Sequence, residues 1–190
     1  LSFVEDPTRV FRAIRFEQRF SFAISRLTAG LIRNAVSMDF FRELSGRRVF
    51  SELRQLLEEE TPPAAIARLN DFGLLKVVHP SLVLSKPLLT RLNATKQVLS
   101  WYDLLFLDES YMKWAVYFLV LIHHCEKGKA EEICVRFELT PRLRKCFVHD
   151  RSNAERCLYW LERSLPVENS GLYHRLSAFR TELILFMMAI

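Results

Sequence analysis

The sequence predicts an all-α fold, an elongated array of many helices, and three observations favour it. Half of the 190 residues are apolar and fifteen are Phe, whereas Gly (5) and Pro (7) are scarce. Such a composition argues against disorder and against a loop-rich β architecture. Apolar residues recur at helical spacing along most of the chain, and no segment alternates as a strand does. No run reaches the roughly 18 apolar residues that cross a bilayer, so no membrane partner is expected.

Capping residues place the first helices. Asp6 and Pro7 predict the start of a helix that runs to about Phe20, because Asp accepts from free backbone N–H groups and Pro needs no donor there. Thr28 is the expected cap of a second helix, and Ser45 begins a third. Further helical segments are expected at residues 62–73, 87–106, 110–124, 129–138, 141–151, 153–163 and from 170 onward. A short turn or helix is expected at residues 38–43, and a short buried segment at 74–78. The break at residues 79–87 is the expected boundary between an N-terminal and a C-terminal region.

Charge and cysteine usage limit the partner and the compartment. The formal net charge of +5 favours polyanionic partners such as nucleic acid. The four cysteines form no C-x-x-C pair and have no histidine at zinc-ligand spacing. We therefore expect reduced, partly buried thiols and a cytoplasmic protein. Because the chain begins with Leu1 rather than Met, we expect it to be a fragment of a longer chain.

The stretch Glu5-Asp6-Pro7-Thr8-Arg9 places acids and an arginine at the entrance of the first predicted helix. An ionised Asp presents only acceptors and Arg presents only donors, so together they match a nucleobase with an exocyclic amine beside a ring nitrogen. Cytosine and adenine carry that pattern. An ordinary helix cap at Asp6 is the alternative interpretation.

Three arginines share one face of this first helix, within ~60° of one another, and the opposite face is apolar. They are Arg12, Arg15 and Arg19. Arginine suits bidentate phosphate contacts better than lysine does, so this cationic face predicts a nucleotide or RNA contact. Pairing with structural acids is the alternative.

A second motif, residues 44–53 (LSGRRVFSEL), follows some forty residues later. By itself it predicts a surface helix with an Arg48–Glu52 pair worth a few tenths of a kcal/mol. The two motifs in this order resemble the neck helix and the following motif of the superfamily of class II tRNA nucleotidyltransferases and bacterial poly(A) polymerases. Residues 63–80 are similar to the body region of that superfamily. The resemblance is specific over roughly residues 1–82 and loose thereafter.

The resemblance implies that side chains of the first motif replace a nucleic-acid template. Asp6 and Arg9 would hydrogen-bond the Watson–Crick edge of incoming CTP or ATP, and Glu5 would help to orient the arginine. Arg12 and Arg15 would face the triphosphate or the RNA 3′ end.

The resemblance also implies a supporting role for Arg48 and Glu52, on a helix that braces the base-reading helix. Phosphoryl transfer needs carboxylates that hold two metal ions, and the sequence has no Asp-x-Asp pair. We therefore expect no catalytic residue and no metal ligand in this chain. In the family those carboxylates and Mg²⁺ belong to an N-terminal catalytic head that precedes the neck.

The sequence therefore predicts a C-terminal helical fragment of a tRNA nucleotidyltransferase that adds CCA or A to the tRNA 3′ end. Its partners would be the tRNA 3′ end, ATP and possibly CTP, and the catalytic head. Residues 1–80 would form the neck and first body helices, which bind RNA and nucleotide, and residues 81–190 the C-terminal body and tail. A fragment of a poly(A) polymerase is one alternative.

Two other classes of function compete with this interpretation. A helical RNA-binding or interaction module would use basic patches on phosphate. Those patches are Arg26, Arg33, Arg42, Arg47 and Arg48, or Arg142, Arg144, Lys145 and Arg151. The stretch His123-His124-Cys125 resembles the His-Asp dyad of metal-dependent phosphohydrolases, but Cys125 stands where a hard metal ion needs a carboxylate. We therefore expect no metal there.

Overall fold

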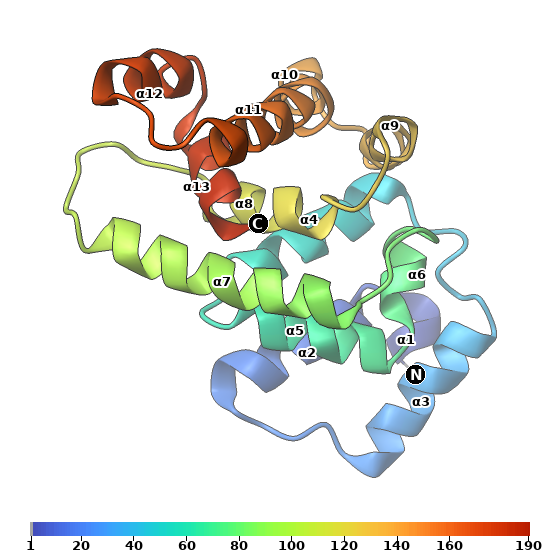
Figure 1. Cartoon of the computed structure of the whole chain (residues 1–190). Coiled ribbons are helices and arrows are strands. Elements are labelled where there is room, and N and C mark those ends of the chain that lie inside the picture. Colours follow the sequence, from blue (N-terminus) through green and yellow to red (C-terminus); the bar gives the residue numbers. More distant parts are fainter. Residues whose placement is uncertain (1) are drawn as a thin grey trace. The chain divides into compact units, whose positions relative to one another are not determined.

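A computed structural model describes residues 2–190, with the side chains from residue 3 onward. Every regular element in this range is a helix (Figure 1), which confirms the all-α prediction. The chain divides into two compact units. Unit 1 comprises the residues up to Thr90 together with Val135–Glu138, and unit 2 comprises Arg91–Cys134 and Leu139–Ile190. The assignment of RNA and nucleotide binding to residues 1–80 stays a prediction.

The helices of unit 1 are α1 (Ser2–Glu5), α2 (Arg9–Phe20), α3 (Arg26–Ser37), α4 (Gly46–Leu57), α5 (Pro62–Asp71) and α6 (Leu74–Val78). Ser45 caps α4 as predicted, because its side chain accepts from the Arg48 N–H. The predicted cap at Thr28 is wrong. Ser25, in an extended backbone conformation, accepts from the Thr28 N–H at 3.1 Å and caps α3 instead.

The core of unit 1 lies between α2, α4 and α5, which pack against one another. Helix α2 buries Val10, Phe11 and Ile14 and leaves its arginines on the other side, as its amphipathic pattern predicts. Helix α4 contributes four apolar side chains to the same core, namely Val49, Leu53, Leu56 and Leu57. Full burial of each such side chain contributes roughly 1.5–3 kcal/mol. This packing fixes the orientation of α2 and so positions the first motif.

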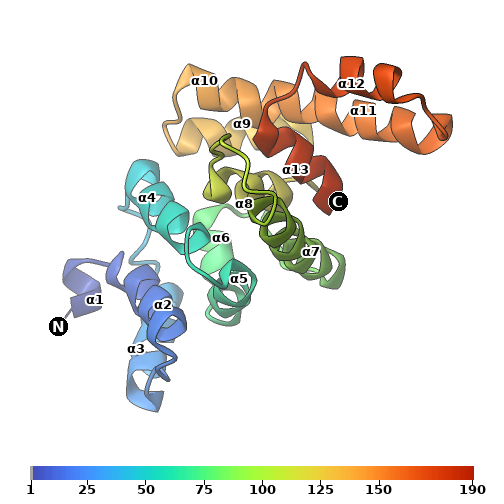
Figure 2. The same cartoon turned by 90° about the vertical axis from the view of Figure 1, so that its left-hand side faces the viewer.

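Helix α7 (Lys86–Asp103) begins in unit 1 and continues in unit 2, and α9 (Lys127–Arg136) begins in unit 2 and ends in unit 1. The other helices of unit 2 are α8 (Lys113–Leu121), α10 (Pro141–Arg144), the π-helical turn η1 (Lys145–Asp150), α11 (Arg151–Ser164), α12 (Asn169–Leu176) and α13 (Thr181–Ala189). Helix α8 is buried from Trp114 to Leu121, as expected of a helix that is apolar on all sides. Figures 1 and 2 both show α13 beside α8, and the two helices pack together.

Residues 141–164 form one uninterrupted helical stretch, α10, η1 and α11. The prediction of two separate helices over 141–151 and 153–163 is wrong, because the π turn shifts the helical register while the backbone stays helical. All four cysteines are buried, and none of them forms a disulfide. Among residues 2–190 no helix is both long and apolar enough to span a membrane.

Candidate nucleotide-binding site

Asp6 lies in the turn between α1 and α2, and one oxygen of its carboxylate accepts three hydrogen bonds. Asp6 Oδ1 accepts from Thr8 Oγ1 at 2.6 Å, from the Thr8 N–H at 3.1 Å and from Arg48 Nη2 at 2.9 Å. The Thr8 hydroxyl, followed by the Thr8 N–H and the Arg48 and Arg12 charges, lowers the pKa of Asp6 despite partial burial. Asp6 is therefore an ionised acceptor at neutral pH. Its Oδ2 has no hydrogen-bond partner among the described residues.

Arg9 and Glu5, the other predicted members of the first motif, are exposed. Glu5 ends α1 and Arg9 begins α2, so the two residues and Asp6 are brought together at one helix junction. In the described part of the chain, the Arg9 guanidinium has no ion-pair partner. In the structure, Arg48 therefore binds the Asp6 carboxylate, and Arg9 is left available. The predicted base-reading role of Asp6 and Arg9 stays a prediction.

The arginines of α2 form a ladder with residues of α4 and with Glu59, which follows the end of α4. Arg12 Nε donates to Glu52 Oε1 at 2.9 Å, and Arg19 Nη2 lies 2.8 Å from Glu59 Oε1. Between them, Arg15 donates to Gln55. Each pair has the same separation of 40 residues, because two packed helices advance side by side. The guanidinium of Arg12 has its pKa raised by its hydrogen bond and charge interaction with Glu52. This geometry favours the structural alternative for Arg12 and Arg15, and the supporting role of Glu52 stays a prediction.

A pocket of about 470 Å³ is lined by Glu5 and Pro7, the chain neighbours of Asp6, although neither Asp6 nor Arg9 is among its lining residues. Glu5 and Arg48 line it, together with residues that the motifs did not indicate, Asp39, Phe40 and Arg42. Asp39 adopts the left-handed conformation, with φ at 54°, which is uncommon outside glycine and is enriched at functional sites. The sequence indicated this part of the pocket only as a short turn or helix at residues 38–43. The pocket therefore combines carboxylates, guanidinium groups and an aromatic ring.

A half-buried ion pair between Glu17 and Arg68 fixes the loop after α2. The Glu17 carboxylate accepts from Arg68 Nε at 2.7 Å, from Arg68 Nη2 at 3.0 Å and from the Ile24 N–H at 3.0 Å. Burial alone would raise the pKa of Glu17, but these hydrogen bonds and the Arg68 charge outweigh it and hold the pKa below its usual value. The sequence signalled neither partner, because the two residues lie 51 positions apart.

The predicted basic patch of unit 2 divides between surface and core. Arg144 and Lys145 line a pocket of about 610 Å³. Arg151, by contrast, is 2% exposed and donates to the carbonyls of Phe147, His123 and Cys125. The prediction that Arg151 contacts phosphate is therefore wrong. Within residues 2–190, no three His, Cys, Asp or Glu side chains gather in a way that could hold a metal ion.

The fold and the site define an all-helical segment that carries an acid and guanidinium cluster at a helix junction. Residues 21–84 match the family described as "Probable RNA and SrmB-binding site of polymerase A". The A-adding tRNA nucleotidyltransferase of Geobacter sulfurreducens is 42% identical over the whole of this chain. The CCA-adding enzyme of Thermotoga maritima, solved in complex with tRNA-CCA, superposes with a TM-score of 0.81 at 28% identity. The chain belongs to the superfamily of tRNA nucleotidyltransferases and poly(A) polymerases.

The extent of these matches defines which part of the superfamily the chain represents. It covers 22% of the length of the Geobacter enzyme and 45% of the solved Thermotoga chain. A CCA-adding enzyme solved in complex with ATP gives a TM-score of 0.82 at 28% identity, and this chain covers 44% of it. The multifunctional CCA protein of Xanthomonas campestris is 39% identical over 43% of this chain and 20% of that protein. The chain is thus homologous to a helical segment of longer proteins.

Proposed function

We propose that this chain is the nucleobase-selecting and RNA-binding segment of a tRNA nucleotidyltransferase that adds nucleotides to the tRNA 3′ end. The observation that carries the proposal is the state of Asp6. Its carboxylate is ionised and held by Thr8 and Arg48 through Oδ1 alone, and Arg48 also lines a pocket together with Glu5 and Pro7, the chain neighbours of Asp6. Catalytic carboxylates and Mg²⁺ would be supplied by a head domain of the longer protein.

The proposed chemistry of base selection uses the unpartnered Asp6 Oδ2 as acceptor and the unpaired Arg9 guanidinium as donor. In this proposal Asp6 Oδ2 accepts from the exocyclic amine of adenine or cytosine, and Arg9 donates to the adjacent ring nitrogen. Guanine and uracil present an oxygen where the amine would be, so a fixed carboxylate repels them. Thr8 and Arg48 preorganise Asp6, and that lowers the cost of fixing it when the base binds. Arg12 and Arg15 act through the ladder and hold α2 in place.

We further propose that ATP is the nucleotide added. Two A-adding tRNA nucleotidyltransferases, from Geobacter sulfurreducens and Aquifex aeolicus, align with 100% and 99% of this chain. The multifunctional CCA proteins align with only 42–43% of it. Incorporation of ATP and CTP into tRNA that ends in CC, compared with tRNA that lacks all of CCA, tests this choice. Addition of CTP by the full-length protein would contradict it.

The test of the main proposal uses the full-length protein that carries this segment. We expect Asp6→Asn and Arg9→Ala to lower nucleotide addition at least about 100-fold, because each removes a hydrogen bond that the site is built to make. RNA affinity should remain nearly unchanged. Matched controls are Asp71→Asn and Arg163→Ala, which alter exposed residues of the same types.

The alternatives predict other outcomes. Failure of the unaltered protein to add any nucleotide, with RNA affinity that depends on the arginines of unit 1, would indicate a binding module instead. Template-free extension of any RNA by many adenosines would indicate a poly(A) polymerase. Unchanged addition by both Asp6→Asn and Arg9→Ala would overturn the assignment of base selection to this motif.

A further inference from the structure

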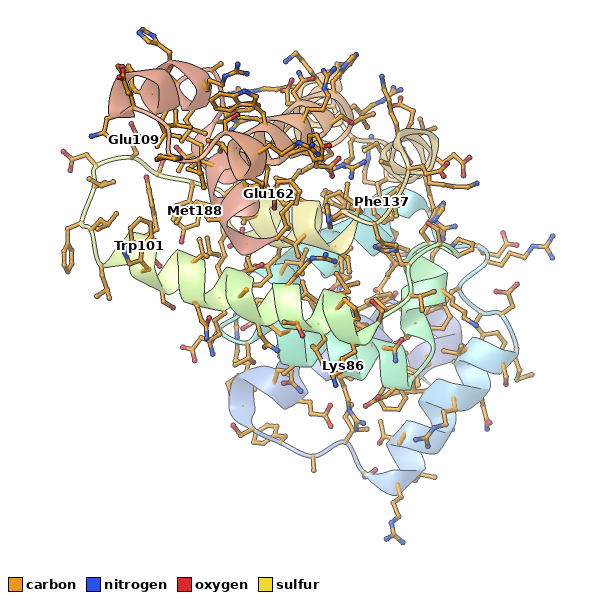
Figure 3. The ribbon with its side chains drawn as sticks, in the orientation of Figure 1. Lys86, Trp101, Glu109, Phe137, Glu162 and Met188 are labelled. Atoms are coloured by element: carbon orange, nitrogen blue, oxygen red, sulfur yellow. The ribbon has the colours of Figure 1, made fainter. Side chains whose placement is uncertain are left out.

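The loop between α7 and α8 exposes an unusual concentration of apolar surface. Residues 104–107 read Leu-Leu-Phe-Leu, and their exposed fractions run from 42% at Leu105 to 87% at Phe106. Trp101, at the end of α7, is a further 48% exposed. Figure 3 shows Trp101 on the last turn of α7 and Glu109 on the far side of the loop. Contiguous exposed apolar residues of this size mark interaction sites on soluble proteins.

Hydrogen bonds fix both ends of this loop. The Tyr111 hydroxyl donates to Asp103 Oδ1 at 2.8 Å, and its ring meets Tyr102 edge to face at 5.3 Å. Burial, together with the Asp103 carboxylate, raises the pKa of Tyr111 and keeps it a donor. On the far side, Glu109 accepts from Thr181 Oγ1 at 3.2 Å. The loop is therefore held in shape, and that lowers the entropy cost of docking.

The charges around the loop restrict what can cover it. Residues 97–112 contain three acids, Asp103, Asp108 and Glu109, and no Lys, Arg or His. RNA and anionic lipid surfaces both need cationic contacts, so neither is favoured. Loop-to-loop pairing of two copies would bring the acids of both together and is disfavoured in the same way. The complementary surface is an apolar recess with lysine or arginine side chains on its rim.

We propose that residues 104–107 dock into a basic-rimmed apolar recess on another folded domain of the longer polypeptide. This rests on the proposed function, in which the chain is one segment of a full-length enzyme. The Geobacter relative aligns over the whole of this chain, the loop included, and the chain is 22% of its length. Such a protein has ample chain to supply the recess. A domain docked there would be held to unit 2 by contacts distant in sequence from the nucleotide site.

Thiol labelling tests the proposal with no assay of activity, so its result is independent of whether the protein adds nucleotides. Phe106→Cys introduces a thiol at the loop tip, and Ser170→Cys on α12 is the exposed control. The native cysteines are buried, and burial raises the pKa of Cys134 to about 12 and of Cys146 to about 11, which makes both thiols unreactive. Tryptic peptides 97–113 and 164–175 report the two sites and contain no native cysteine.

We expect the Phe106→Cys thiol to react with a maleimide at least about tenfold more slowly in the full-length protein than in the 190-residue chain, as docking for about 90% of the time requires. The Ser170→Cys thiol should react equally fast in both. Adding Asp108→Lys should restore fast labelling of the loop in the full-length protein, because it places a cation against the basic rim. Glu162→Lys, an exposed change on α11, should not.

Three results would overturn the proposal. Equal labelling of the loop in the full-length protein and in the chain alone would show that no domain covers it. Protection in the chain alone that increases with protein concentration would assign the loop to a second copy. Protection of the chain by added tRNA would assign it to RNA.

Discussion

At the scale of single residues, the side chains that matter most are acids held by arginines. Glu52 is only 5% exposed, and its Oε2 has no hydrogen-bond partner within the described residues. Its other oxygen depends on Arg12. A buried carboxylate with a single hydrogen-bond partner destabilises the fold once that partner is removed. Asp6 differs, because its side chain is still 22% exposed.

Removal of Arg12 should destabilise the chain through Glu52. We expect Arg12→Ala to lower the free energy of unfolding by about 2 kcal/mol, because it leaves a buried carboxylate unpaired. Arg9→Ala, which removes an unpaired exposed arginine from the same helix, should change it by less than about 0.5 kcal/mol. Urea denaturation followed by circular dichroism measures both. Equal effects of the two variants would contradict the structural role of the ladder.

Glu17 should make unit 1 sensitive to acid. Its folded-state pKa is lowered, so its contribution is fully present above about pH 4.3, the ordinary value for an unfolded chain. The contribution is lost as the pH falls through the folded-state pKa. We expect Glu17→Gln to be less stable than the unaltered chain at pH 7 and the difference to narrow below pH ~4.3.

Denaturation curves between pH 3 and pH 7 measure that difference. Glu132→Gln is the control, because the Glu132 side chain is 56% exposed and its pair with Lys129 is screened by solvent. A difference between Glu17→Gln and the unaltered chain that stays constant across this range would show that Glu17 has no lowered pKa.

At the scale of elements, the helix starts were only partly predictable, because Thr8 rather than Asp6 is the N-cap of α2 and Ser25 rather than Thr28 is that of α3. Ser45 precedes its helix in the pattern that capping chemistry demands, and the structure has it there. Ser25 and Thr28 are both capping residues three positions apart, and only the extended backbone at Ser25 decides between them. The ladder between α2 and α4 could not be predicted, because no local pattern links residues 40 positions apart.

The start of α4 also depends on a close backbone approach. A Cβ at Gly46 would lie 1.7 Å from the Arg136 carbonyl oxygen, whereas a Cβ at Gly30 on α3 would meet nothing within 4 Å. We expect Gly46→Ala to destabilise the chain by about 2–3 kcal/mol, because backbone must move. Gly30→Ala should stabilise it by about 0.5–1 kcal/mol through helix propensity. Thermal and urea unfolding check the opposite signs, and destabilisation by both variants would contradict this reading of the packing.

At the scale of the whole molecule, the net charge of +5 does not show which arginines are free to bind a polyanion, and those of α2 are largely paired. Arg12 and Arg15 face partners on α4, and Arg19 faces Glu59 just after its end. Arg42, which lines the pocket, has no ion-pair partner in the part of the chain that the structure describes. Composition predicted a polyanionic partner, but which cations are available to one depends on tertiary pairing. The fold class was predictable from helical periodicity, whereas the pocket, formed in part by a left-handed Asp39, was not.

The salt dependence of RNA binding should reveal this distribution. We expect Arg42→Ala to reduce the slope of log K against log salt by roughly 0.7–0.9, the value for one phosphate contact. Arg19→Ala should leave the slope unchanged, since Glu59 already neutralises that side chain. Fluorescence titrations of a tRNA acceptor stem at several salt concentrations measure it. Equal slope changes for both variants would show that paired and unpaired arginines contribute alike.

The π turn at Lys145–Asp150 has a consequence for how this chain tolerates insertions and deletions. A π turn accommodates an extra residue relative to an α-helical turn, and each residue of an α-helix rotates the chain by about 100°. Loss of one residue from this turn would restore α-helical winding and swing the first turn of α11 away from the core, Arg151 included. The Arg151 guanidinium would then lose its hydrogen bonds to the carbonyls of His123 and Cys125. A single codon deletion here should therefore be far more damaging than one in the loop at residues 104–110.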